Sequence, residues 1–142
     1  MKKSAHQDAT TVARTQAALG AMNEVAPSLV EAIVLTDDGF EVARHPARGT
    51  GGATAGAGAA DGSFAGMASS MQALSEAVAQ ELGIGTSQHV MIAAPGGHVV
   101  QLRIPDRQLV LAALFDTDET LGKALAASRR CAERIGADLA GL

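Results

Sequence analysis

The sequence predicts an α/β (α+β) fold, a five-stranded antiparallel sheet flanked by helices, and three observations lead to it. Apolar residues recur at helical spacing in three segments and at strand spacing in five others. These segments follow the order α-β-β-α-β-β-β-α. All but one of the connections between them are short, which favours antiparallel neighbours. With 142 residues, the chain is expected to form a single domain over 1–142.

The N-terminal part of the chain predicts a helix followed by a β-hairpin. The helix is expected over residues 8–25, and Pro27 ends it because proline cannot continue a helix interior. The run 29–36 is rich in β-branched residues and predicts a strand. Asp37-Asp38-Gly39 predicts a hairpin turn, since glycine accepts the positive φ of a short turn. The second strand then returns over 40–44.

Residues 47–62 are a low-complexity run of glycine and alanine. Glycine has much conformational entropy to lose and no side chain to pack, so we expect a flexible surface loop inside the domain. A phosphate-binding P-loop would need a lysine, and none occurs between Lys3 and Lys123.

The second helix is expected over residues 63–82, where large apolar side chains form a single stripe. Small residues lie beside the stripe, which suggests that another element approaches this helix closely. The stripe can pack on the sheet of its own chain, on a second copy of the chain, or on both. Its members are Phe64, Met67, Met71, Leu74, Val78 and Leu82.

The C-terminal part of the chain predicts three strands and a helix. The strands are expected over 88–94, 98–104 and 108–115. The last of them is almost entirely apolar, which suits a central strand covered on both faces. The final helix is expected after Asp116, which together with Glu119 resembles a capping box.

Composition and charge exclude several classes of function. The net charge is −4, no block of basic residues occurs, and the chain has no Trp, no Tyr and only three Phe, so nucleic-acid binding is not expected. Cys131 is the only cysteine, which favours a reduced, cytoplasmic setting. No window approaches the roughly 20 apolar residues of a membrane span, so no membrane insertion is expected.

Candidate chemical groups are few. His89 and His98 lie on either side of one predicted turn and could be cross-strand neighbours, but a zinc site would need further ligands. Ser69 and Ser70 lie within a helix without an acid–base partner in sequence. Cys131 falls in the last helix and is expected to pack there. We therefore expect no catalytic residue, no metal and no cofactor.

Three segments carry a resemblance to a known family. Residues 31–43 form a hairpin with an acidic-glycine turn, 67–78 belong to the second helix, and 99–115 contain the last two strands. Together with the order of elements over about 8–140, they resemble the Roadblock/LC7 (MglB-like) family, and only the long segment 47–62 departs from it. The resemblance implies a profilin-like fold and a homodimer, with second helices packed antiparallel and third strands joined edge to edge. It also implies a Ras-like small GTPase as partner.

The resemblance and the apolar stripe together define a candidate dimer or partner interface. Methionines suit such an adaptable protein-binding surface. Its residues are Phe64, Met67, Met71, Leu74, Val78, Val90, Met91 and Ile92.

Two classes of function remain open. The first is a non-catalytic homodimeric regulatory or scaffold protein that binds a Ras-like small GTPase and changes its activity or placement. The alternative is a small-ligand sensor of the PAS or GAF kind, which shares a five-stranded antiparallel sheet. Sensor pockets are usually lined with aromatic residues, and aromatic residues make up only 2% of this chain.

Overall fold

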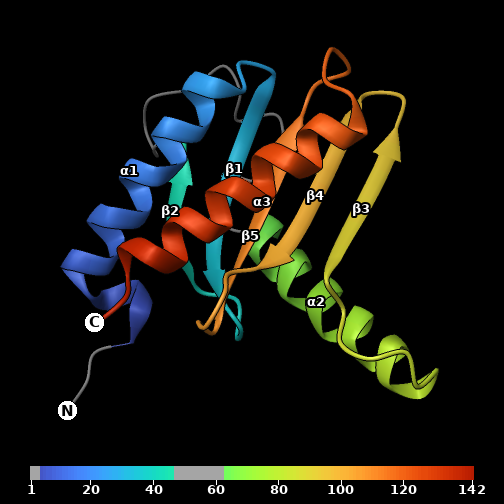
Figure 1. Cartoon of the computed structure of the whole chain (residues 1–142), viewed down its shortest axis with the longest axis horizontal. Coiled ribbons are helices and arrows are strands. Elements are labelled where there is room, and N and C mark those ends of the chain that lie inside the picture. The colour runs from blue at the N-terminus through green and yellow to red at the C-terminus, as the bar shows by residue number, and fades with distance from the viewer. Residues whose placement is uncertain (1–3, 47–62) are drawn as a thin grey trace.

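The computed structural model describes residues 4–46 and 63–142 (Figure 1). The segment expected to be a flexible Gly/Ala loop, 47–62, lies outside the described residues. Most predicted elements are confirmed to within a residue or two. They are a short 3₁₀ helix η1 (Ala5–Gln7), which the sequence did not predict, followed by α1 (Ala9–Val25), β1 (Leu29–Thr36), β2 (Glu41–His45), α2 (Ser63–Glu81), β3 (His89–Ala94), β4 (Gly97–Arg103), β5 (Leu109–Phe115) and α3 (Leu121–Asp138).

The five strands form one antiparallel sheet in the order β2-β1-β5-β4-β3. The predicted class is therefore confirmed. The apolar strand β5 lies at the centre, and six of its seven residues are buried, as its composition predicts. The Asp37-Asp38-Gly39 turn joins β1 to β2 with Gly39 at a φ of 91°, a conformation that glycine adopts without steric cost.

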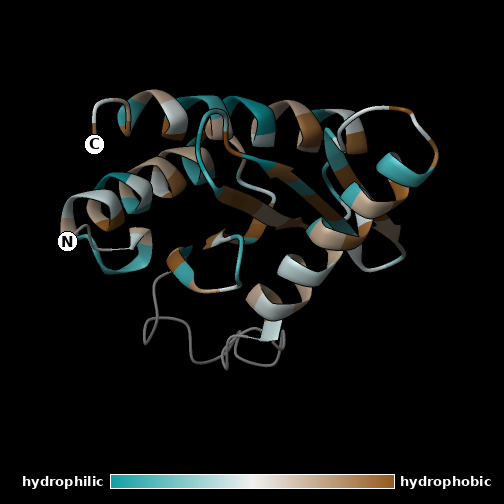
Figure 2. Cartoon of the chain, turned by 90° about the horizontal axis from the view of Figure 1, so that it is seen from below, coloured by the Kyte–Doolittle hydropathy of each residue, from teal (hydrophilic) through white to brown (hydrophobic). Residues whose placement is uncertain are grey.

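Helices cover both faces of the sheet but to different extents (Figures 1 and 2). α1 and α3 lie side by side on one face, where the larger core forms around Leu19, Phe115 and Ile135. α2 lies on the opposite face over a small cluster that includes Ile33, Val110 and two alanines of the helix. The strands between these layers are the most hydrophobic part of the molecule (Figure 2).

The start of the last helix differs from the prediction. α3 begins at Leu121, and the side chain of Thr120 caps it by accepting a hydrogen bond from the backbone N–H of Lys123. The capping box predicted from Asp116 and Glu119 is therefore wrong. The Asp116 carboxylate instead accepts from the backbone N–H of Asp118, and the Glu119 carboxylate accepts from the Ser28 hydroxyl, which ties this loop to the start of β1.

The outer side of β2 is in contact with α1. The Gln16 side-chain amide donates to the backbone carbonyl of Arg44 at 2.6 Å, and its carbonyl accepts from the Arg44 backbone N–H at 3.3 Å. The Arg44 side chain is buried and forms ion pairs with Glu31 and Glu41. No helix in the described part of the chain is long and apolar enough to cross a membrane.

Candidate functional site

The face that α2 turns toward the sheet is made of small and polar residues. Ala65, Ala68, Gln72 and Ala79 are buried. The large apolar stripe predicted for this helix lies to one side of that face, and much of it is exposed to solvent. The interpretation that the stripe packs on the sheet of its own chain is therefore wrong for most of its residues. The exposed fractions are 59% for Met67, 66% for Leu74, 48% for Val78 and 65% for Leu82.

Phe64 and Met71 are the exceptions. Phe64 is half-buried and packs against the cluster of Ile33 and Val110. Met71 is also half-buried. The C-terminal end of α2 projects past the sheet edge at β3, and this explains why the later residues of the stripe have no cover (Figure 1).

Polar contacts attach α2 to the sheet. Gln101 of β4 is completely buried, and its side-chain amide donates to the backbone carbonyl of Ala68 at 2.7 Å and to the Gln72 side chain at 3.3 Å. Buried alanines contribute little apolar area, so these hydrogen bonds are important for keeping α2 in place on the sheet.

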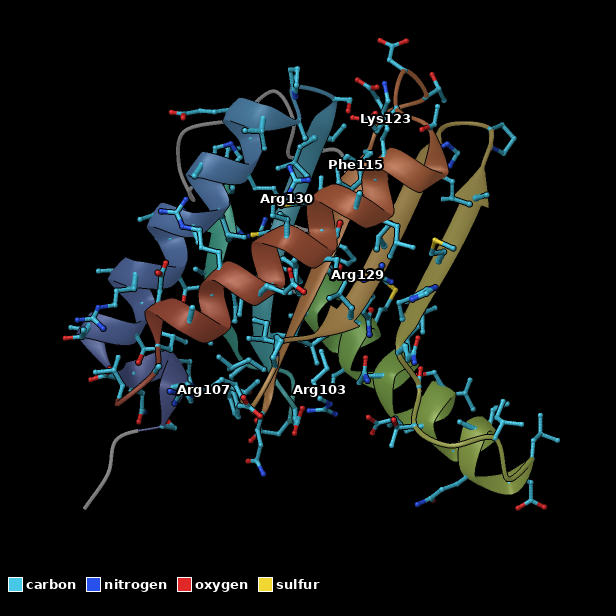
Figure 3. All side chains as sticks on the ribbon, in the orientation of Figure 1. Arg103, Arg107, Phe115, Lys123, Arg129 and Arg130 are labelled. Atoms are coloured by element: carbon cyan, nitrogen blue, oxygen red, sulfur yellow. The ribbon has the colours of Figure 1, made fainter. Side chains whose placement is uncertain are left out.

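Arg103 extends this attachment to the hairpin turn (Figure 3). Its guanidinium forms ion pairs with Asp37 at 2.8 Å and with Glu76 of α2 at 3.0 Å. The Ser69 hydroxyl adds a third link by donating to the Asp37 backbone carbonyl at 2.8 Å. The hydrogen bond from Arg103 lowers the pKa of Glu76 below its ordinary value of 4.5, so this carboxylate is charged at neutral pH.

Strand β3 lies at the edge of the sheet and pairs with β4 alone among the described strands. Val90 and Ile92 lie opposite Gln101 and Val99, so their side chains are on the same face as α2. Met91 lies opposite Val100, on the face that α1 and α3 cover. The three β3 residues of the predicted interface therefore do not share one face: Val90 and Ile92 lie on the face of α2, and Met91 lies on the other, because consecutive strand residues point to opposite faces.

The exposed and half-buried apolar residues of α2, of β3 on the same face and of the link between them are together called the α2–β3 surface. It comprises Phe64, Met67, Met71, Leu74, Val78, Leu82, Ile84, Val90 and Ile92. Ile84 is 73% exposed and was not predicted, because it lies between Gly83 and Gly85 and outside any helical repeat. Six of the nine residues of this surface are between 42% and 73% exposed, and grouped apolar exposure is typical of interaction sites.

The candidate chemical groups lie apart from one another. His89 pairs with Leu102 and His98 with Ala93, so the prediction that the two histidines could be cross-strand neighbours is wrong. Cys131 is buried, and burial raises the pKa of its thiol to about 12. Among residues 4–46 and 63–142, no three His, Cys, Asp or Glu side chains are grouped so that they could hold a metal ion.

An open groove lies at the end of the sheet near the chain termini. Its lining includes the polar residues Asp8, Thr11, Asp38, Asp106 and Arg107. Several of these groups already have partners within the chain. Asp8 caps α1, Asp38 accepts from the Thr36 hydroxyl, and Arg107 donates to the carbonyls of Leu139 and Leu142. Leu109 and Leu139 of the larger core also form part of its lining.

The chain is similar to known proteins in structure but not in sequence. No family model matches the sequence, and no curated protein matches it. MglB from Myxococcus xanthus is 12% identical, with a TM-score of 0.75 over 96% of this chain and 91% of that chain. A Roadblock/LC7 domain from Streptomyces avermitilis is 13% identical, with a TM-score of 0.70 over 84% and 92%. The gliding protein MglB from Thermus thermophilus is 15% identical, with a TM-score of 0.70 over 97% and 93%. The chain thus has the Roadblock/LC7 (MglB-like) fold.

Proposed function

We propose that this chain is a non-catalytic, homodimeric regulatory or scaffold protein that binds a Ras-like small GTPase. It works as a single-domain unit, and its lone buried thiol fits a reduced cytoplasmic setting. The observation that carries the proposal is the exposed α2–β3 surface beside an open strand edge. Both features need a covering partner, because exposed apolar surface and unpaired strand edges promote association.

A second copy of the chain is the partner that fits this surface best. A two-fold axis beside β3 would pair the two β3 strands in antiparallel fashion and continue the sheet from one protomer into the other. Such an axis is perpendicular to the sheet, so it keeps the two faces of the sheet apart. Both α2 helices would then lie on the same face of the joined sheet. Met67, Leu74 and Val78 of each protomer could then pack against the helix of the other.

The GTPase partner rests on the likeness of fold to MglB and to Roadblock/LC7 domains. The non-catalytic part of the proposal rests on the chain's own residues. The Cys131 thiol is buried and protonated at neutral pH, and the Ser69 hydroxyl is engaged with the hairpin turn. A ligand-sensing role has weaker support, since the groove is open to solvent and several of its polar groups already have partners within the chain.

Self-association is tested by the molecular mass in solution. We expect the wild-type protein to have twice the protomer mass of 14.3 kDa by sedimentation or light scattering. Leu74→Asp should shift it to the protomer mass, because the dimer would have to bury an unpaired carboxylate. Leu74 is exposed in the protomer, so circular dichroism should show an unchanged fold.

Val25→Asp is the matched control. Val25 is 70% exposed on α1, away from the α2–β3 surface, and the same apolar-to-acid change there should leave the dimer intact. A wild-type protein that stays at the protomer mass at every concentration would refute the dimer.

The GTPase partner is tested by affinity capture from host lysate supplied with either GDP or a non-hydrolysable GTP analogue. We expect mass spectrometry to identify a Ras-like small GTPase that binds in a nucleotide-dependent way, as expected when a partner contacts the switch loops. Capture of no small GTPase in either nucleotide state would contradict this part of the proposal.

A further inference from the structure

The outer face of α3 differs in charge from the molecule as a whole. α3 contains four basic residues, Lys123, Arg129, Arg130 and Arg134, and two acidic ones, Glu133 and Asp138. The whole chain has a net charge of −4. The basic side chains of α3 are exposed, whereas its apolar side packs into the larger core.

Three of these cations have no partner within the described part of the chain. The side chains of Lys123, Arg129 and Arg130 make no hydrogen bond or ion pair there, although each is a strong donor. The other described arginines all have internal partners: Arg14 donates to the Asp138 carbonyl, Arg44 and Arg103 each hold two carboxylates, Arg107 donates to C-terminal carbonyls, and Arg134 pairs with Asp138.

The three free cations lie on the outer face of α3, with Lys123 and Arg130 on one side of the helix and Arg129 on the other (Figure 3). Lys123 and Arg130 are seven residues apart, which places them about 10.5 Å apart along the helix axis and nearly in line. Arg129 lies beside Arg130. The residues between Lys123 and Arg129 are small or apolar, and no carboxylate occurs between residues 121 and 132. A partner can therefore approach this face of α3 closely.

We propose that the outer face of α3 docks an acidic segment of a partner protein, with carboxylates spaced about two helical turns apart. Charge complementarity is the basis, because each free cation can form a charge-assisted hydrogen bond with a carboxylate. This face lies across the sheet from the α2–β3 surface, so both can be occupied together (Figure 1).

A protein segment fits this face better than a membrane. α3 exposes no large apolar side chain that could enter a lipid layer. Carboxylates also bound the basic face at both ends, with Asp118 and Glu119 before the helix, and Glu133 and Asp138 after Arg130. A broad anionic surface would meet these carboxylates, whereas a short acidic segment fits between them.

The probe is a fluorescein-labelled helical peptide with Glu pairs seven residues apart on an Ala/Gln background, and fluorescence anisotropy measures its binding. The same peptide with Gln in place of Glu is the control ligand. We expect only the acidic peptide to bind, and Arg129→Gln/Arg130→Gln to weaken its binding at least about tenfold. Binding should also fall as salt is raised from about 50 mM to about 500 mM, because exposed charges are then screened.

A matched variant separates a local site from bulk charge. Gln7→Glu/Gln80→Glu changes the net charge by the same amount at exposed positions outside α3, and it should bind the peptide nearly as the wild type does. Three results would overturn the proposal: no binding at the lower salt concentration, equal weakening in both double variants, or tighter binding to phosphatidylglycerol vesicles than to the peptide. Because Arg129→Gln/Arg130→Gln leaves the α2–β3 surface intact, its mass in solution reports on the proposed dimer separately.

Discussion

Arg103 is the residue at which three parts of the fold meet. Its guanidinium on β4 holds the hairpin turn through Asp37 and α2 through Glu76. The three side chains are between 34% and 42% exposed, so solvent screens each ion pair. We expect Arg103→Gln to lower the free energy of unfolding by about 1 kcal/mol at pH 7, measured by urea denaturation.

The contribution of Arg103 should depend on pH. The folded-state pKa of Glu76 is depressed, so the stability that it contributes is present above its unfolded-state pKa. That stability is lost as pH falls through the folded-state pKa, which lies below 4.5. The difference between the wild type and Arg103→Gln should therefore shrink below that pH. Arg134→Gln, which breaks an exposed pair, is the control and should have little effect, whereas a difference that is constant from pH 7 to pH 3 would contradict the assignment.

Cys131 gives a probe of opening in the larger core. Its thiol is buried with a pKa of about 12, so very little reactive thiolate is present at pH 8. We expect a thiol reagent to label it only as fast as the protein unfolds, with labelling rising through the urea transition. Full labelling of the native protein within minutes would show that the contact between α1 and α3 opens locally.

At the scale of elements, the turn between β3 and β4 depends on a single glycine. A Cβ atom on Gly97 would lie 2.5 Å from the backbone carbonyl oxygen of Phe115 on β5, and a backbone atom cannot move aside easily. Gly97→Ala should therefore cost about 2 kcal/mol of stability, measured by thermal or urea unfolding. The neighbouring Gly96 has open space around its Cβ position, so Gly96→Ala is the matched control and should unfold nearly as the wild type does.

Strand positions could be predicted from the sequence because β-branched runs and turn residues bound them closely, as for 29–36 and its Gly39 turn. The packing of α2 could not. A stripe of large apolar residues normally marks the buried face of a helix, but here alanines and Gln72 face the sheet. The local pattern at 116–121 was also ambiguous, since Asp116 and Thr120 are both good caps and only the path of the chain selects Thr120.

The candidate interface was predictable in part. The sequence identified the apolar stripe of α2, but the exposed positions of Leu74 and Val78 follow from the angle at which α2 leaves the sheet. Ile84 belongs to no periodic pattern, and Met91 lies on the other face because strand residues alternate. Helical and strand periodicities locate a face within its own element, while the relation between elements comes from tertiary packing.

At the scale of the whole molecule, stability should depend on protein concentration. If only the folded state dimerises, mass action stabilises the folded protein as its concentration rises. We expect the unfolding temperature of the wild type to increase over a hundredfold range of concentration, measured by calorimetry, and that of Leu74→Asp to stay constant. A wild-type unfolding temperature that does not change with concentration would argue against a dimer of folded protomers.

The two edges of the sheet are not equivalent. On β2, the Gln16 side chain supplies one donor and one acceptor to the Arg44 backbone, as the peptide group of a sixth strand would do. On β3, no such substitute is present among the described residues. The sheet therefore has one open edge, and in the proposed dimer the pairing of β3 with β3 would occupy that edge in both copies. In the proposed dimer, growth would end at two protomers, so a chain with an exposed apolar edge would assemble without forming open-ended fibrils.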